Sequence, residues 1–180
     1  RLLTIPVLPK GIATWLRHFW LLTYGRFRIW RSKTDLFHVL DGSYAYLVPG
    51  SSKTPTVTTV HDLIPLLQQE GRFGENRGSR LASLLINLSV NGSRRSTRLV
   101  ADSSNTARDV VRYAGIVSSD ISTVPLPLHP GFADAARLVE QQVEKSGSYI
   151  LHVGNNGYYK NREGVVRIFS RLSTNKTTRL

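Results

Sequence analysis

A strand, a capped helix and a helix end follow one another in Leu99-Val-Ala-Asp-Ser-Ser-Asn-Thr-Ala-Arg-Asp-Val-Val-Arg-Tyr-Ala-Gly-Ile116. The apolar residues 99–101 predict a buried strand. A serine or asparagine in the polar group that follows can cap a helix over residues 106–113. Gly115 stands where a helix commonly ends, because glycine adopts the left-handed backbone of a helix C-terminus without strain. A strand leading directly into a helix is typical of α/β domains.

The flanking sequence repeats this alternation. Short runs rich in β-branched or apolar residues predict strands at 36–40, 56–60 and 121–124. Four leucines at helical spacing predict a helix over 80–90. Strands that are apolar throughout are typical of parallel sheets covered on both faces. We therefore predict an α/β fold, with a Rossmann-like parallel sheet and helices on both of its faces.

Polar residues stand directly after the predicted strands. In open parallel sheets, ligands bind beyond the carboxyl ends of the strands. The residues at those ends are Asp41, His61, Asp102, Ser103 and Gly154. The sequence therefore places a candidate site along this edge.

A second strand, loop and helix start are predicted for Tyr149-Ile-Leu-His-Val-Gly-Asn-Asn-Gly-Tyr-Tyr-Lys-Asn161. Backbone N–H groups, the positive end of a helix dipole and the Lys160 ammonium would meet there, which suits a phosphorylated ligand. Residues 125–131 hold three prolines and break regular structure before a predicted helix over 133–145. This arrangement predicts two domains joined by a linker.

Composition limits the classes of partner and site. The 180 residues carry a net charge of +12 and no cysteine, so disulfides and thiolate zinc sites are excluded and anionic partners are favoured. No apolar run is long enough to span a membrane, and no signal peptide is recognisable. We expect a cytoplasmic protein. Because the chain does not begin with methionine and its second domain barely starts, we also expect a fragment truncated at both ends and inactive by itself.

Residues 13–31 predict a helix that contains all three tryptophans together with several arginines. Two interpretations stay open. A basic, tryptophan-rich amphipathic helix can lie on an anionic membrane at its inner face. Alternatively, the helix packs into the core and its arginines extend to solvent along their aliphatic stems.

Four motifs follow one another along the chain: Val57-Thr-Thr-Val-His-Asp-Leu-Ile-Pro65, the stretch 99–116, Ile121-Ser-Thr-Val-Pro-Leu-Pro-Leu-His-Pro-Gly-Phe132, and Ile150-Leu-His-Val-Gly154 with Lys160-Asn161. Their order resembles glycosyltransferase family 4 of the group 1 type, whose members are retaining enzymes with the GT-B fold. The resemblance implies that 1–130 is the rear part of an N-terminal acceptor-binding domain. It makes 131–148 a linker region and 149–180 the start of a C-terminal nucleotide-sugar-binding domain.

The same resemblance implies roles for individual residues. His61 would face the transferred sugar, and Lys160 would neutralise the donor diphosphate; these are the expected catalytic residues. Gly154 and Asn155 would complete the donor-binding segment, although Asn155 stands where many members have an arginine. Asp41, Ser43 and Tyr44 are candidates for the acceptor side, but Asp41 and Ser43 could equally form a turn and a helix cap.

Together these features predict a glycosyltransferase (hexosyltransferase) in the parent protein. It would move a hexose from a nucleotide-diphosphate sugar to a glycan or lipid-linked acceptor without a metal or other cofactor. A non-catalytic GT-B-like scaffold and a basic nucleic-acid-binding module are the alternatives. Nucleic acid is the less favoured partner, because the aromatic residues cluster in one helix and the strands are apolar.

Overall fold

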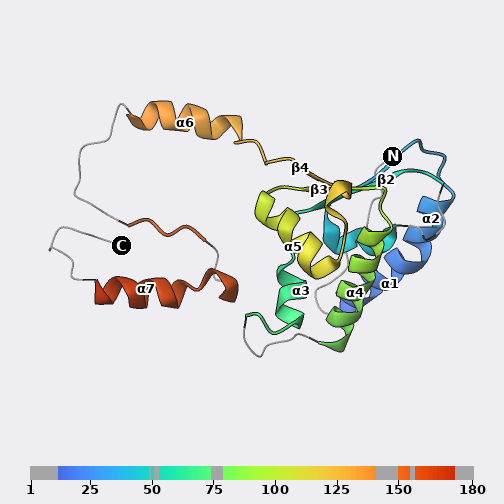
Figure 1. The fold of residues 1–180 in the computed structure, drawn as a ribbon, viewed down its shortest axis with the longest axis horizontal. Helices are drawn as coiled ribbons and strands as arrows, with labels where there is room; N and C mark the ends of the chain where they lie inside the picture. Colours follow the sequence, from blue (N-terminus) through green and yellow to red (C-terminus); the bar gives the residue numbers. More distant parts are fainter. Residues whose placement is uncertain are drawn as a thin grey trace. The chain divides into compact units, whose positions relative to one another are not determined.

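A computed structural model describes residues 12–48, 50, 53–73, 79–140, 150–154 and 157–172 (Figure 1). The chain divides into two compact units, Arg1–Pro125 and Leu126–Leu180. Their boundary falls at the start of the proline-containing stretch that was expected to break regular structure. Each unit is described by itself below.

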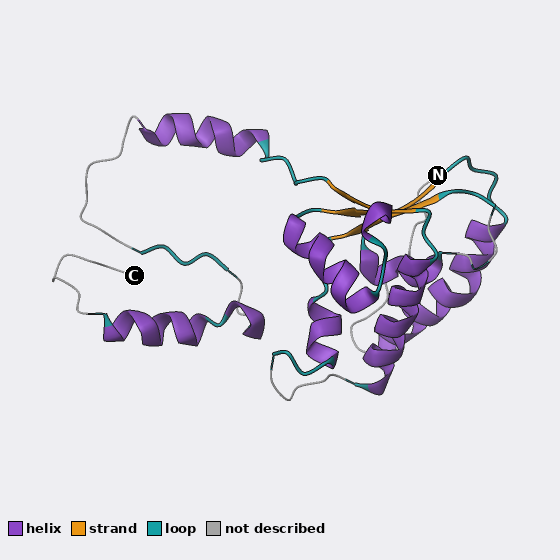
Figure 2. Cartoon of the chain, viewed as in Figure 1, coloured by secondary structure: helices purple, strands orange, loops and turns teal. Residues whose placement is uncertain are grey.

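The first unit is built on a parallel sheet in the order β1-β2-β3-β4 (Figure 2). Its strands are β1 Phe37–Val39, β2 Thr56–Val60, β3 Arg98–Ala101 and β4 Ile121–Thr123. All three neighbouring pairs are parallel, as expected from strands separated by helical connections. The predicted α/β class with a Rossmann-like parallel sheet is therefore confirmed.

Helical crossovers join these strands. They are the 3₁₀ helix η2 Gly42–Leu47, then α3 Ile64–Gln69 and α4 Arg80–Arg94, then α5 Ser104–Ala114 and η3 Ser118–Asp120. Because the strand order advances in one direction, right-handed crossovers all fall on the same face. Figure 2 shows α3, α4 and α5 on one side of the strands, where both faces had been expected to carry helices. The other face of β2 keeps Val57 and Thr59 partly exposed.

Burial of that helix-covered face forms the core. Val60 and Leu99 from the sheet pack with Val110 and Ala114 of α5 and with Ile116. The predicted helix caps are present: Ser103 Oγ accepts from the backbone N–H of Thr106 at 3.1 Å. Gly115 has a φ of +63° at the C-terminus of α5. Caps and core together hold α5 against β3 and β4.

Helix α4, in the crossover from β2 to β3, packs closely on η2, in the crossover from β1 to β2. Ser89 Oγ donates to the carbonyl oxygen of Ser43 at 2.7 Å. Gly92 is buried against η2, and a Cβ at this position would lie 1.9 Å from the carbonyl oxygen of Ala45. The backbone of η2 therefore approaches α4 only because residue 92 has no side chain.

The predicted N-terminal helix is confirmed. It comprises α1 Ile12–Trp20, one π-helical turn η1 Leu21–Gly25 and α2 Arg26–Trp30, each leading directly into the next. Leu21 and Gly25 are buried on its inner side. Two bonds tie it to η2: Arg17 Nη2 donates to the Tyr44 hydroxyl at 2.7 Å, and His18 Nδ1 lies 2.9 Å from the Tyr46 hydroxyl.

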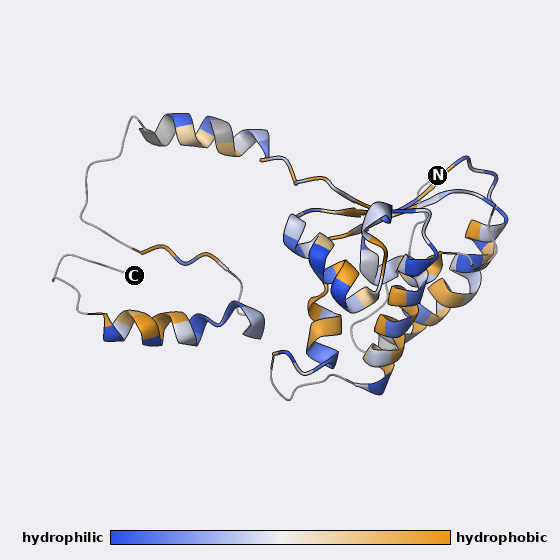
Figure 3. Ribbon diagram, viewed as in Figure 1, coloured by the Kyte–Doolittle hydropathy of each residue, from blue (hydrophilic) through white to orange (hydrophobic). Residues whose placement is uncertain are grey.

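The opposite side of this helix is exposed. We call it the aromatic outer face; it consists of Leu16, Phe19, Tyr24, Phe27 and Trp30. Phe19 is 67% exposed and Trp30 is 64% exposed, so neither packs into the core. Figure 3 shows hydrophobic and hydrophilic residues interspersed along α1 and α2. The core-packing interpretation thus holds for the inner side of the helix only.

The second unit contains α6 Pro130–Glu140, the 3₁₀ turn η4 Tyr158–Lys160 and α7 Arg162–Arg171. The predicted strand over 149–154 is not formed in the described residues 150–154. A strand requires a neighbouring strand to pair its backbone groups, and the described part of this unit holds none. The predicted helix start after Lys160 is confirmed, with Asn161 as the N-cap of α7.

Replacing Gly92 with alanine should destabilise the first unit. The added Cβ must displace the η2 backbone, and overpacking of this kind costs about 1–3 kcal/mol. Urea unfolding followed by circular dichroism measures the loss. Gly50→Ala is the control, because a Cβ there meets no heavy atom within 4 Å. Equal stability of the two variants would contradict the described contact.

The docking of α1 on η2 should weaken in acid. Burial, and to a lesser extent the neighbouring Arg17 guanidinium, lowers the pKa of His18 below its usual 6.5. The folded state therefore binds fewer protons than the unfolded state at this site. The stabilisation is complete above pH 6.5 and is lost as the pH falls through the lowered value.

The measurement is the free energy of unfolding between about pH 7.5 and pH 5. His18→Gln should flatten this dependence relative to wild type, whereas His129→Gln, which removes an exposed histidine, should leave it unchanged. The same pH dependence in wild type and His18→Gln would show that His18 does not couple docking to protonation.

Candidate active site

His61 lies at the carboxyl end of β2, where the pairing with β3 places it beside Asp102. In that pairing Val60 stands opposite Ala101, so the next residue of each strand leaves the sheet at the same edge. His61 Nδ1 lies 3.3 Å from Asp102 Oδ2, and its Nε2 lies 3.1 Å from the Leu40 carbonyl oxygen. The strand ends thus bring together two of the residues predicted for this edge.

Residues at the N-terminus of α5 contact both His61 and Asp102. Thr106 is buried, and its hydroxyl lies 3.0 Å from the His61 carbonyl oxygen and 3.2 Å from Asp102 Oδ1. Ser103, the N-cap, completes the group at 2.9 Å from the Thr106 hydroxyl. Sequence reasoning placed Asp102 at a strand end but gave it no partner, and it missed Thr106. Hydrophobic periodicity predicts strands but does not say which strands are neighbours.

The predicted acceptor-side residues have structural contacts. Asp41 is the N-cap of η2 and accepts from the Ser43 N–H at 2.8 Å, as the alternative interpretation expected. The Tyr44 hydroxyl accepts from Arg17, as described above. Asp41 and Ser43 are both exposed, so both remain accessible to a ligand. Their acceptor role stays a prediction.

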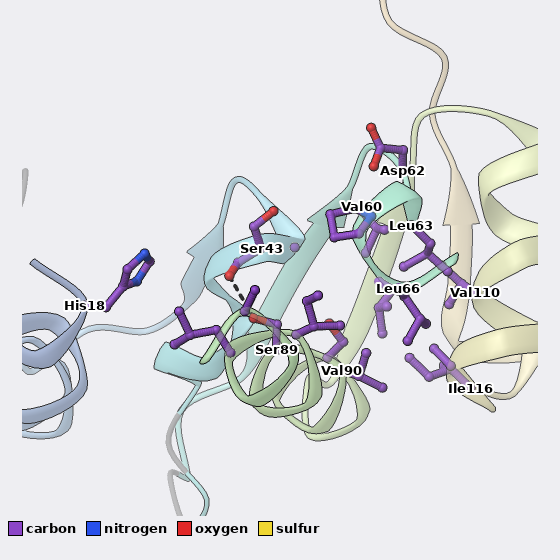
Figure 4. A pocket seen from close by; sticks show the side chains of 18 residues that line it. His18, Ser43, Val60, Asp62, Leu63, Leu66, Ser89, Val90, Val110 and Ile116 are labelled. Carbon is purple, nitrogen blue, oxygen red and sulfur yellow. Dashed lines mark hydrogen bonds between the residues drawn. The ribbon is translucent and has the colours of Figure 1, made fainter. Parts of the chain in front are cut away.

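A cavity of about 260 Å³ lies beneath this edge of the sheet (Figure 4). Most of its lining is apolar and comes from β2, β3, α3, α4 and α5, including Val60, Leu66, Val90 and Val110. Figure 4 shows Asp62 at the end of this lining and Ser43 hydrogen-bonded to Ser89 on another side. The cavity suits an apolar group better than a sugar, whose hydroxyls would lack partners there.

The predicted donor-binding residues lie in the second unit. The side chain of Lys160 packs beside Gly154, since a Cβ on that glycine would lie 3.4 Å from Lys160 Cγ. The Lys160 ammonium also sits 5.4 Å from the centre of the Tyr159 ring. The structure therefore brings Gly154 and Lys160 together at the start of α7. Asn155 lies outside the described residues.

Sequence reasoning overlooked His152 in the same segment. Its Nε2 is shielded from solvent and has no hydrogen-bond partner among the described residues. It also lies 3.7 Å from the position of a Cβ on Gly154. His152 stands within the apolar run that was predicted to be a strand, and nothing in its sequence spacing marked it as a candidate site residue.

Arg26, Arg28 and Arg31 accompany the aromatic outer face on the same helix. None of the helices in the described ranges is both long enough and apolar enough to cross a membrane. The described residues also contain no cluster of three histidine, aspartate or glutamate side chains that could hold a metal ion.

Comparison with known proteins agrees with the motif order. The sequence profile of Glycosyltransferase Family 4 matches residues 3–131, which is more than half of the chain. The match includes the whole parallel sheet and His61. No curated protein matches the chain closely enough to be significant. The family supports glycosyl transfer, with a sugar donor and an acceptor, as the general chemistry. The chain belongs to glycosyltransferase family 4.

Proposed function

We propose that the protein is a retaining hexosyltransferase. It moves a hexose from a nucleotide-diphosphate sugar to a glycan or lipid-linked acceptor. The observation that carries this proposal is the position of His61 at the carboxyl edge of a parallel sheet in a chain of this family. His61 is 44% exposed at its side chain, so the imidazole can reach a ligand while staying attached to the sheet edge.

The donor diphosphate is assigned to the second unit. Gly154 allows the backbone to approach a phosphate closely, and the adjacent Lys160 supplies a positive charge. As the glycosyl bond breaks, negative charge grows on the departing nucleoside diphosphate. A fixed ammonium stabilises this charge more than that of the ground state, and so lowers the barrier. No metal is needed for this step.

The domain roles follow from this assignment. Residues 1–130 would form the rear of the acceptor-binding domain, 131–148 the linker region and 149–180 the start of the donor-binding domain. The apolar cavity lined by Val60, Asp62 and Leu63 at the end of β2 supports a lipid-linked acceptor, because it offers a hydrocarbon group a site out of water. The acceptor-side candidate Ser43 contributes to the same lining.

The aromatic outer face supports attachment to a membrane. Aromatic side chains can enter the interfacial region of a bilayer while neighbouring arginines pair with anionic headgroups. The proposed location is therefore cytoplasmic and peripheral, at the inner face of a membrane, where a lipid-linked acceptor is available.

A non-catalytic scaffold is the second candidate. Asn155 stands where many members of the family have an arginine, which removes one cation from the diphosphate site. In that case the fold would persist while the donor would bind weakly. Binding of the donor to the chain distinguishes the two candidates.

Changing Lys160 to alanine should weaken nucleoside diphosphate binding roughly 10- to 100-fold, the usual range for a hydrogen bond to a charged group. Isothermal titration calorimetry with UDP, GDP and ADP measures this loss. Arg171→Ala is the matched control, because it removes one exposed cation from the last turn of α7. Equal losses in both variants, or no diphosphate binding at all, would contradict the donor assignment.

Reversing the charge of Arg26, Arg28 and Arg31 with glutamate should release the chain from anionic vesicles. Each basic residue near such a surface contributes about 1 kcal/mol. Co-sedimentation with phosphatidylserine vesicles measures the bound fraction.

A second variant, in which Phe19, Phe27 and Trp30 are replaced by serine, tests how much the aromatic side chains contribute to binding. The control reverses Arg80, Arg108 and Arg112, which are exposed elsewhere. Unaltered binding of the first variant would remove the membrane proposal.

A further inference from the structure

We propose that Asp102 is the positioning residue of His61, holding its Nδ1–H so that Nε2 presents a lone pair to a hydroxyl of the transferred sugar. This inference rests on the proposed function of His61, and it assigns a role to a residue outside the expected catalytic set. Its evidence is the contact network where β2 and β3 end.

Strand pairing determines that these two side chains meet. The β2–β3 register brings residues 61 and 102 out at the same edge, and Nδ1 lies 3.3 Å from Oδ2. The His61 side chain is 44% exposed, whereas the Asp102 side chain is only 18% exposed. The imidazole is thus open to a ligand, while the carboxylate that orients it is shielded from solvent.

The partners of the imidazole determine which tautomer is favoured. Both groups beside the ring accept hydrogen bonds: the Asp102 carboxylate at Nδ1 and the Leu40 carbonyl at Nε2. A neutral imidazole has one N–H and can donate to only one of them. A hydrogen bond to a charged acceptor is the stronger of the two. The proton therefore belongs on Nδ1, facing Asp102.

The carboxylate itself is fixed by α5. The Thr106 hydroxyl lies within hydrogen-bond distance of both Asp102 Oδ1 and the His61 carbonyl oxygen. It therefore ties the orienting group to the backbone of the residue that is oriented. Asp102 also directly precedes the N-cap Ser103, where the positive end of the helix dipole favours a negative charge.

With the proton on Nδ1, Nε2 is a hydrogen-bond acceptor. Once Nδ1 carries the proton, two lone pairs face each other between Nε2 and the Leu40 carbonyl, which is unfavourable. A sugar hydroxyl that donates to Nε2 takes the place of the Leu40 carbonyl oxygen, which lies 3.1 Å from that nitrogen, and replaces an unfavourable contact with a hydrogen bond. His61 thus accepts a hydrogen bond from the transferred sugar, and no proton leaves the ring.

The test is the tautomer of His61 in the full 180-residue chain, read from long-range ¹H–¹⁵N spectra of the imidazoles. The spectra are recorded at a pH about two units above the ordinary histidine value of roughly 6.5. His61→Gln identifies the resonances by their disappearance. We expect Nδ1 to give the pyrrole-type shift of a protonated nitrogen and Nε2 the pyridine-type shift of an acceptor.

Asp102→Asn should lower the ratio of the Nδ1–H to the Nε2–H form roughly fivefold or more, because the acceptor loses its charge. Asp109→Asn is the matched control: it removes a carboxylate from α5, the helix that follows Asp102, and should leave the tautomer unchanged. Circular dichroism confirms that each variant is folded. Thr106→Val, which keeps the side-chain shape, should shift the ratio in the same direction.

Three results would overturn the proposal. They are an Nε2–H tautomer in the wild type, a ring that stays protonated on both nitrogens at that pH, and an Asp102→Asn variant with an unchanged ratio. In the last case Asp102 would serve stability alone. Because the tautomer is measured without a substrate, its outcome is separate from that of the diphosphate titration, which tests the proposed function.

Discussion

Parallel pairing of β2 with β3 is the constraint on which the site depends. Parallel strands end at the same edge, so the residues that follow them become neighbours although 41 positions separate His61 from Asp102. The crossovers must then pack on the sheet, and their apolar faces form the core with Val60 and Leu99. The site edge and the core are therefore two results of one pairing.

The same geometry explains why the crossover helices α3, α4 and α5 gather on one face of the sheet. A strand order that only advances gives right-handed crossovers on a single side. The helix-covered face of β2 is buried, whereas Val57 and Thr59 on the other face are partly exposed. The tight approach of α4 to η2 at Gly92 shows how close this one-sided packing is.

Charge and aromatic residues are separated from this core. The N-terminal helix uses Leu21, Gly25 and two hydrogen bonds to reach η2, and leaves its aromatic outer face in solvent. Exposing several large aromatic side chains is unfavourable unless a partner covers them. The nearby arginines are the second feature on which the proposed attachment to an anionic surface rests. In the second unit, the Lys160 side chain packs beside Gly154, which is the geometry on which the proposed diphosphate site rests.

The sequence by itself determined the α/β class, the four strands of the first unit, its N-terminal helix, α4 and α5, and the caps at Ser103 and Gly115. These features depend on local periodicity and on residues whose backbone preferences act within one turn. The strand predicted at 149–154 was wrong for the described residues because an apolar run becomes a strand only when another strand pairs with it.

Tertiary structure alone decided the rest. It placed Asp102 and Thr106 around His61, turned the aromatic residues outward and set the close approach at Gly92. Each of these features depends on which distant segments become neighbours. The neighbours are decided when right-handed crossover helices bury one face of the sheet. Such long-range choices leave no periodic signal in the chain.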